Sequence, residues 1–308
     1  MAKRTKGTVG IVGLGIMGGA FARNLVAGGW RVIGFDTDAA RRRAAAKAGI
    51  EIAKDAAALA RATTTLITSL PNPQALETTV AALAPAKTRR KILIETSTFA
   101  LDDKRRAEAA LRKAGHVMLD CPVSGTGAQA RTKDVVVYAS GDGAAIRKSR
   151  RLFAGFARGL HDLGAFGNGS KMKYVANLLV AIHNVASAEA MVLGIKAGLA
   201  PQQIFDLVTA GVGTSRVFEL RAPMMVRNRY ENASMKIATW QKDLDVIGSY
   251  AAGIGAPTPL MSATLPIYAA AMATGHALHD TASVCAVLER MAGVRRKSAS
   301  RRRARRAR

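Results

Sequence analysis

The stretch TVGIVGLGIMG at residues 8–18 decides the fold of the first half of the chain. Its apolar run Val9–Val12 has the composition of a buried strand, and glycines follow directly at positions 13, 15 and 18. The spacing G-x-G-x-x-G between a strand and a helix is typical of a turn that binds a dinucleotide, whereas the bare motif is weak. We therefore expect a pyrophosphate site at a helix N-terminus. The predicted cofactor contacts of this turn are Gly13, Leu14, Gly15, Ile16, Met17 and Gly18.

Short apolar runs alternate with Ala-rich amphipathic stretches through the first half of the chain. We expect strands at Val9–Val12, Arg31–Phe35, Thr65–Ser69, Lys91–Glu95, His116–Asp120 and Val135–Ala139. We expect helices near Gly18–Ala27, Ala39–Ala48, Pro73–Leu83 and Asp102–Lys113. This alternation predicts an α/β domain over residues 1–168, in which helices cover both faces of a doubly wound parallel sheet.

The pattern changes after about Gly169. Ser170–Ala197 has no proline and only one late glycine, which predicts a single long helix. Further helices are expected at Pro201–Ala210, Arg216–Met225, Ala238–Ala252, Pro259–Ala273 and Ser283–Met291. We therefore expect an all-helical domain at residues 169–294, for substrate binding and oligomerisation, and a disordered basic tail at residues 295–308.

Asp36 ends the second expected strand, eighteen residues after Gly18. A carboxylate at this place can accept hydrogen bonds from the adenosine ribose and repels a 2′-phosphate, which favours NAD over NADP. The arginines at positions 41–43 follow closely and could reach such a phosphate, so NADP stays open. A solvated helix face is the interpretation of these arginines that we prefer.

Four motifs in order resemble the β-hydroxyacid dehydrogenase family, which includes 3-hydroxyisobutyrate dehydrogenase. The stretch Ile11–Leu25 is similar to the family's N-terminal signature. The stretch Asp120–Gly125 resembles its substrate-binding segment, and Gly167–Asn177 resembles its catalytic segment. Lys242–Leu244 resembles its Lys-Asp-Leu motif in the helical domain. The resemblance covers about residues 8–291 and implies an oxidoreductase that moves a hydride between a nicotinamide cofactor and a short 3-hydroxy acid or its semialdehyde.

The resemblance also implies roles for individual residues. Lys173 is the expected acid/base residue, and Asn177, four positions later, shares its helix face and can hold the same substrate oxygen. A lysine that cofactor and substrate desolvate has a lowered pKa and becomes a workable base. Ser124 and Gly125 are expected to bind the substrate's acid group. Besides Asp36, the resemblance implies the further cofactor contacts Leu70, Pro71, Thr98 and Lys242.

The sequence departs from the family pattern just after the Ser-Gly pair. Thr126 stands where a second glycine is usual, and Gln129 and Lys133 stand where further glycines are common. These departures leave the substrate open more than the class of reaction.

The composition limits the partners. Of the formal net charge of +25, nine positive charges lie in the tail, so the body is moderately basic and suits a small anionic substrate. The two cysteines and the absence of a recognisable secretory signal or long uninterrupted apolar run indicate a cytoplasmic protein outside the membrane. No metal ligands are expected at useful spacing. The apolar helical half predicts a homodimer or homotetramer.

Two alternatives remain. Imine reductases share this architecture but commonly lack lysine at the position of Lys173. A non-catalytic nucleic-acid-binding relative would use the tail RRRARRAR, which supplies salt-dependent phosphate affinity. The tail has no aromatic residue for base stacking, so we expect at most nonspecific binding through it.

Deletion of residues 295–308 tests the role of the tail. The truncation lowers the net charge by nine and removes no side chain larger than alanine that could be buried in a core. We expect unchanged oligomeric state and specific activity, and weaker retention on DNA at low salt. Steady-state kinetics and DNA retention across a salt series measure both. A large loss of catalytic efficiency, or loss of a salt-resistant DNA complex, would contradict this expectation.

Overall fold

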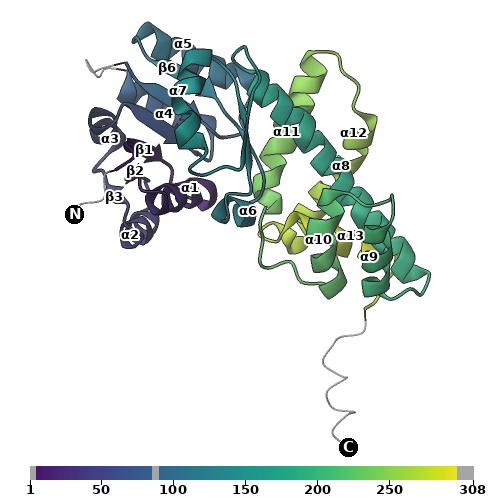
Figure 1. Ribbon diagram of the computed structural model, residues 1–308. Helices are drawn as coiled ribbons and strands as arrows, with labels where there is room; N and C mark the ends of the chain where they lie inside the picture. Colours follow the sequence, from purple (N-terminus) through teal and green to yellow (C-terminus); the bar gives the residue numbers. More distant parts are fainter. Residues whose placement is uncertain (1–4, 85–89, 297–308) are drawn as a thin grey trace, which may run out of the picture. The chain divides into compact units, whose positions relative to one another are not determined.

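The computed structural model describes residues 5–84 and 90–296. The chain divides into two compact units, residues 1–176 and 177–308, which we describe one at a time (Figure 1). Most of the tail predicted to be disordered, from residue 297 onward, lies outside the described residues.

The first unit contains a six-stranded parallel sheet with the order β3-β2-β1-β4-β5-β6. The strands are β1 (Thr8–Val12), β2 (Arg31–Phe35), β3 (Glu51–Ile52), β4 (Thr65–Thr68), β5 (Ile92–Glu95) and β6 (Val117–Asp120). The predicted doubly wound sheet is therefore confirmed. The strand order reverses between β1 and β4, and in such sheets ligands bind at the carboxyl ends of the strands beside this reversal.

Helices cover both faces of this sheet (Figure 1). They are α1 (Ile16–Ala27), α2 (Ala39–Lys47), α3 (Ala56–Ala62), α4 (Pro73–Leu83), α5 (Leu101–Lys113), α6 (Gly127–Arg131) and α7 (Gly143–Phe153). Neighbouring strand residues point to opposite faces, so Ile67 packs in the core beneath α1 and α7, and Leu66 packs in the core beneath α3, α4 and α5. Both faces are apolar, as a buried parallel sheet requires.

A second sheet corrects one expectation. It has the order β7-β8-β9 and consists of β7 (Val123–Ser124), β8 (Val136–Ala139) and β9 (Gly159–Asp162). The strand expected at Val135–Ala139 therefore exists but lies outside the large parallel sheet. The reason is local: β7 follows β6 after two residues, and β8 returns antiparallel to β7. This reversal brings Ser140 into an antiparallel bridge with Asp120.

Helices α8 to α13 follow, as predicted. They are α8 (Asn168–Lys196), α9 (Pro201–Ala210), α10 (Arg216–Arg227), α11 (Ile237–Gly253), α12 (Pro259–Ala271) and α13 (Val284–Met291). A π-helical turn (Met272–His276) and a 3₁₀ turn (Thr281–Ser283) connect the last two helices. Helix α8 begins in the first unit and continues into the second.

Helix α8 is long and apolar enough to cross a membrane, by length and composition alone. Its polar residues, however, make the contacts of a core helix. The buried Asn184 amide donates hydrogen bonds to the Tyr268 hydroxyl at 3.0 Å and to the Thr281 carbonyl at 2.9 Å. A buried polar group with protein partners is what the interior of a folded domain requires.

Candidate active site

The three glycines of the first turn do different work. Gly13 has φ +90°, and a Cβ there would lie 2.1 Å from the Ser69 carbonyl oxygen. A Cβ at Gly18 would lie 2.0 Å from the carbonyl oxygen of Gly13. Both positions therefore require glycine for the protein's own packing. A Cβ at Gly15 would meet nothing closer than the Arg41 Nη1 atom at 3.6 Å, so the space over this residue is left for a ligand.

The first turn of α1 fits a dinucleotide pyrophosphate. Gly15 is the N-cap residue of this helix, and no side chain caps the free N–H groups of the turn. Uncapped N–H groups and the positive end of the helix dipole attract phosphate, and the bare backbone of Gly15 allows close approach. The residues present therefore fit NAD or NADP, with Gly13–Gly18 as the part that would hold the phosphates.

Asp36 follows β2 and is tied to the glycine turn. Its Oδ2 accepts a hydrogen bond from the Leu14 N–H at 2.8 Å, and its Oδ1 accepts one from the Asp38 N–H at 2.8 Å. The carboxylate is 5% exposed, and Arg41 Nη1 lies 3.5 Å from Oδ2. Each carboxylate oxygen has a second lone pair and can still accept a ribose hydroxyl. Arg41 is half-exposed and lies beside both Asp36 and Gly15. It is therefore closer to the glycine turn than the predicted solvated helix face would place it.

Two further predicted cofactor segments follow β4 and β5. The Leu70 N–H donates to the Ser97 Oγ at 2.8 Å, so the two segments are joined next to the glycine turn. Pro71 is exposed and Thr98 is half-buried. Both lie at the carboxyl edge of the sheet, where the reversal of strand order places a bound cofactor.

The predicted substrate segment lies beside the start of α1. Gly125 follows β7 with φ +139°, and a Cβ there would come 2.7 Å from the Val135 side chain. A Cβ at Gly127 would come 2.3 Å from Ile16 Cγ2, which shows how closely α6 packs on the first turn of α1. The half-buried Ser124 and Gly125 are thereby held near the glycine turn.

Two of the three departures from the family pattern, Thr126 and Gln129, have a structural explanation. Thr126 is the N-cap of α6 and forms a capping box with Gln129, whose Oε1 accepts the Thr126 N–H at 3.0 Å. Lys133 has φ +61°, a conformation that glycine adopts more readily. The capping box therefore explains Thr126 and Gln129, whereas nothing in the structure explains the lysine at position 133.

The start of α8 is clamped to the carboxyl end of β6. A Cβ at Gly169 would lie 2.4 Å from the Tyr138 carbonyl and 2.7 Å from the Asp120 carbonyl, so only glycine allows this approach. The Ser170 N–H donates to Asp120 Oδ2 at 2.7 Å, and its hydroxyl donates to Asp120 Oδ1 at 2.8 Å. Lys173 is half-buried and follows three residues later on the same helix.

In the second unit, Asp243 links two of the predicted residues. The Asn177 amide donates to Asp243 Oδ2 at 2.9 Å, and Lys242 Nζ lies 2.7 Å from Asp243 Oδ1. Asp243 and Asn177 are buried, whereas the Lys242 side chain is one-third exposed. An acid next to Lys242 in the sequence can either orient this lysine or be a surface acid. The burial of Asp243 and its two contacts favour the first role, and they add Asn177 as a partner that the sequence does not reveal.

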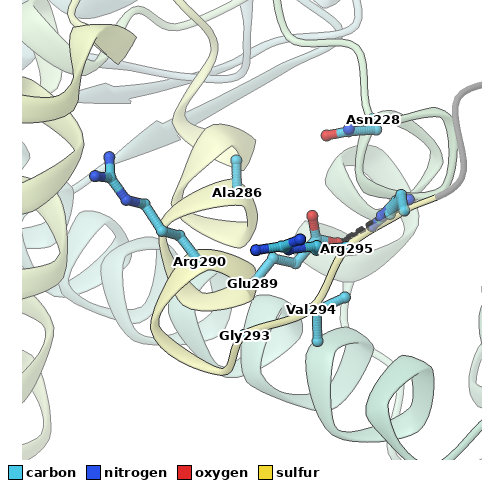
Figure 2. Close-up of a pocket in the computed structure, with 8 residues that line it drawn as sticks. Asn228, Ala286, Glu289, Arg290, Gly293, Val294 and Arg295 are labelled. Atoms are coloured by element: carbon cyan, nitrogen blue, oxygen red, sulfur yellow. Dashed lines mark hydrogen bonds and ion pairs between the residues drawn. The ribbon is translucent and has the colours of Figure 1, made fainter.

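Other features of the described residues add no rival site. A cavity of about 410 Å³ lies near the end of α13. Figure 2 shows residues that line it, among them Asn228, Glu289 and Arg290. Glu289 is already ion-paired with Arg296 there, and none of the predicted site residues lines this cavity. Within residues 5–84 and 90–296, no three His, Cys, Asp or Glu side chains are placed to hold a metal ion.

Comparisons with known proteins agree with this geometry. Residues 8–167 match the family profile of the NAD binding domain of 6-phosphogluconate dehydrogenase. Residues 167–288 match the profile for the NAD-binding of NADP-dependent 3-hydroxyisobutyrate dehydrogenase. The L-threonate dehydrogenase of Cupriavidus necator is 30% identical over 284 residues, which cover 90% of this chain and 94% of that one. The chain belongs to the β-hydroxyacid dehydrogenase family. It is thus an oxidoreductase with a binding domain for NAD or NADP.

Solved structures support the same family. The 3-hydroxyisobutyrate dehydrogenase of Mycobacterium tuberculosis with L-serine has a TM-score of 0.82 and 29% identity, covering 91% of this chain and 98% of that one. The corresponding structure from Salmonella typhimurium has a TM-score of 0.83 and 28% identity, with coverage of 91% and 99%. An imine reductase from Bacillus cereus is more distant, at a TM-score of 0.60 and 16% identity, and shares only the fold.

Alanine at Gly15 should weaken cofactor binding, whereas alanine at Gly18 should weaken the fold. Gly18→Ala places a methyl group against backbone, so we expect a loss of about 1–3 kcal/mol in the free energy of unfolding. Gly15→Ala has room in the protein and should change stability by only about 0.5 kcal/mol, but its methyl group should weaken NADH binding. Urea unfolding and NADH fluorescence titration measure the two effects. Equal NADH affinity in Gly15→Ala and the wild type would argue against this turn as the phosphate site.

Proposed function

We propose that this protein is an NAD-dependent dehydrogenase of a short 3-hydroxy acid, or a reductase of the corresponding semialdehyde, with Lys173 as its acid/base residue. The observation that carries the proposal is the placement of Lys173 one helical turn before Asn177, on a helix whose first turn Asp120 holds by two hydrogen bonds. A proton-transfer group must be positioned before its pKa matters, and this helix start is a fixed one.

Lys173 would exchange the proton of the substrate hydroxyl. When bound, the nicotinamide exchanges a hydride with the substrate's carbinol carbon. In oxidation the amine form of Lys173 takes the hydroxyl proton, and in reduction its ammonium form returns one to the carbonyl oxygen. Burial by substrate and cofactor favours the neutral amine, which makes the lysine a competent base near neutral pH.

Asn177 would hold the substrate oxygen, and Asp243 would hold Asn177. Because the Asn177 amide donates to Asp243, its side-chain oxygen faces away from the carboxylate and remains an acceptor. The same carboxylate pairs with Lys242, so one buried acid sets the orientation of both residues. We assign Lys242 to the cofactor and Asn177 to the substrate, with Asp243 as their positioning residue.

Ser124 and Gly125 would bind the acid group of the substrate. A hydroxyl and backbone N–H groups in a glycine turn can bind a carboxylate. Relatives of this chain are named for L-threonate, 3-hydroxyisobutyrate and L-serine, all short hydroxy acids. A short acid with its hydroxyl near the carboxylate is therefore the substrate class that we propose.

Assembly, domain roles and location complete the proposal. We assign residues 1–168 to the cofactor, residues 169–294 to substrate binding and self-association, and residues 295–308 to at most nonspecific contact with nucleic acid. Arg296 is the exception in this tail, because it pairs with the buried Glu289 and donates to the Val226 carbonyl at 3.0 Å. The helical part exposes several large apolar side chains, among them Leu193, Leu207 and Leu260, each at least 66% exposed. Exposed apolar side chains gathered on one domain suit a homodimer or homotetramer. We place the protein in the cytoplasm.

Replacement of Lys173 tests the chemistry. Lys173→Ala should lower kcat by about 10²–10⁴-fold, because a positioned acid/base group contributes that much, while NADH affinity should stay near the wild-type value. Lys171→Ala is the matched control: Lys171 lies on the same helix, 3.1 Å from the Asn168 side chain, and is not assigned to the reaction. Steady-state kinetics on a panel of short hydroxy acids gives the comparison. A Lys173→Ala enzyme with more than about a third of wild-type activity would refute the assignment.

Asp36 tests the choice of cofactor. We expect the wild type to prefer NADH over NADPH, because the carboxylate binds the ribose and repels a 2′-phosphate. Asp36→Ser should weaken NADH binding by about tenfold and move the preference toward NADPH. Arg41→Ala should lower any remaining NADPH use and spare NADH. Kinetics with both cofactors measures the ratio, and a wild type that uses NADPH better would show that Arg41 outweighs Asp36.

A further inference from the structure

Lys104 of α5 is a fully buried lysine between two buried carboxylates. Its Nζ lies 2.7 Å from Glu95 Oε2 and 2.8 Å from Asp120 Oδ1, and all three side chains are 0% exposed. Glu95 ends β5 and Asp120 ends β6, and the two are register partners across neighbouring parallel strands. The lysine therefore joins the last residues of two strands at the edge of the sheet that binds the cofactor.

One arm of this cluster leads to the cofactor segments. Glu95 Oε1 accepts a hydrogen bond from the Ser97 N–H at 2.8 Å. The Ser97 hydroxyl oxygen in turn accepts the Leu70 N–H at 2.8 Å. The backbone of both predicted cofactor segments, after β4 and after β5, is thus fixed by the Glu95 carboxylate.

The other arm leads to the helix that carries Lys173. Asp120 accepts the Ser170 N–H and the Ser170 hydroxyl at 2.7 and 2.8 Å, and the Ser140 hydroxyl at 3.3 Å. The Ser140 Oγ accepts the Gly169 N–H at 3.0 Å. Two successive residues at the start of α8 are therefore held by Asp120 and its neighbour, within one turn of Lys173.

The cluster is charged. Burial alone would lower the pKa of Lys104, but the carboxylates of Asp120 and Glu95 outweigh burial and raise this pKa above its usual value. Cys121 follows Asp120 in the chain, and burial raises the pKa of its thiol well above the usual range. Tyr174, on α8, donates its hydroxyl to the Phe99 carbonyl at 2.6 Å. The Lys104 ammonium is thus the positive charge that the two adjacent carboxylates share.

We propose that Lys104 is a positioning residue of the dehydrogenase reaction: its ammonium binds the carboxylates of Glu95 and Asp120 at the same time and so fixes the cofactor segments and the start of the Lys173 helix together. This rests on the proposed function, because it concerns the same site. A buried ion pair is weak support for stability, since apolar residues often replace it without loss. The position of this ion pair between two functional segments is therefore what indicates a role beyond stability.

Removal of the lysine should make the enzyme sensitive to alkaline pH. In Lys104→Met the two register-paired carboxylates can no longer both ionise freely, so one of them has a raised pKa in the folded protein. A carboxyl group with a raised folded pKa disfavours the folded arrangement increasingly as the pH rises above its unfolded pKa of about 4 toward the raised value. We therefore expect the ratio of variant to wild-type kcat to fall as the pH rises above about 4, by about tenfold or more between pH 5 and pH 8. Thermal unfolding should show the same trend.

The double variant Glu95→Gln/Lys104→Met is the matched control. It removes one carboxylate with the lysine, and the glutamine oxygen can still accept the Ser97 N–H. Its kcat relative to the wild type should not change with pH, although both variants lack Lys104. A purely structural role would lower stability in both without this pH signature. A pH-independent ratio in Lys104→Met, or an equally steep one in the double variant, would overturn the proposal.

Single carboxylate variants carry the test if Lys104→Met does not fold. Glu95→Ala, which removes the acceptor of the Ser97 N–H, should raise the Kd for NADH with little change in kcat. Asp120→Asn should lower kcat with little change in this Kd, because the two arms lead to different segments. Equal effects of both variants on both parameters would refute the two arms. The NADH Kd and the pH-dependent unfolding need no turnover, so they separate this proposal from that for Lys173. Activity retained in Lys173→Ala would refute the proposed role of Lys173 without deciding whether Lys104 positions the two arms.

Discussion

The hydrogen bonds between Asp120 and the first turn of α8 are the contact on which the rest of the site depends. One carboxylate at the end of β6 accepts the Ser170 N–H and hydroxyl, pairs with Lys104, and accepts the Ser140 hydroxyl from the second sheet. The large sheet, the small sheet and the long helix thus meet at one side chain. The carboxylate is buried and has no access to bulk water, so these contacts take the place of hydration. Loss of any one of them would leave a buried polar group unsatisfied and would destabilise the fold.

Close backbone contacts complete what this carboxylate begins. A Cβ at Gly13, Gly18 or Gly169 would clash with a backbone carbonyl oxygen, so these positions need glycine for close backbone packing. Gly15 differs, because the space over it is open. The same type of residue therefore builds the frame at three positions and leaves room for a ligand at the fourth.

Much of this could be predicted from the sequence, for reasons that particular segments make clear. Runs such as Arg31–Phe35 and Pro73–Leu83 carry a full apolar period with flanking turn residues, and their observed bounds agree with those expected. The two-residue strands β3 and β7 carry no period at all, and only pairing with distant strands defines them. The short helix α6 depends on the Thr126 and Gln129 cap.

The candidate site shows the same division. The glycine turn and the spacing of Lys173 and Asn177 are local patterns, so the sequence displays them. The contacts of Asp243 with Asn177 and of Lys104 with Asp120 join residues that are far apart in the chain or lie on different elements. Lys104 shares a helix face of α5 with Leu101, Ala107 and Leu111, and this spacing is the one signal in the sequence that its side chain points inward. Only the fold shows that two carboxylates meet it there.

The buried triad of Lys104, Glu95 and Asp120 constrains how this sequence can drift. Loss of the lysine first leaves two like charges in an apolar interior, whereas loss of Glu95 first leaves a balanced lysine and aspartate. The order of substitutions therefore matters, and the route that begins at Glu95 is the more accessible one. In descendants of this chain, we expect a neutral residue to appear at position 95 before one appears at position 104.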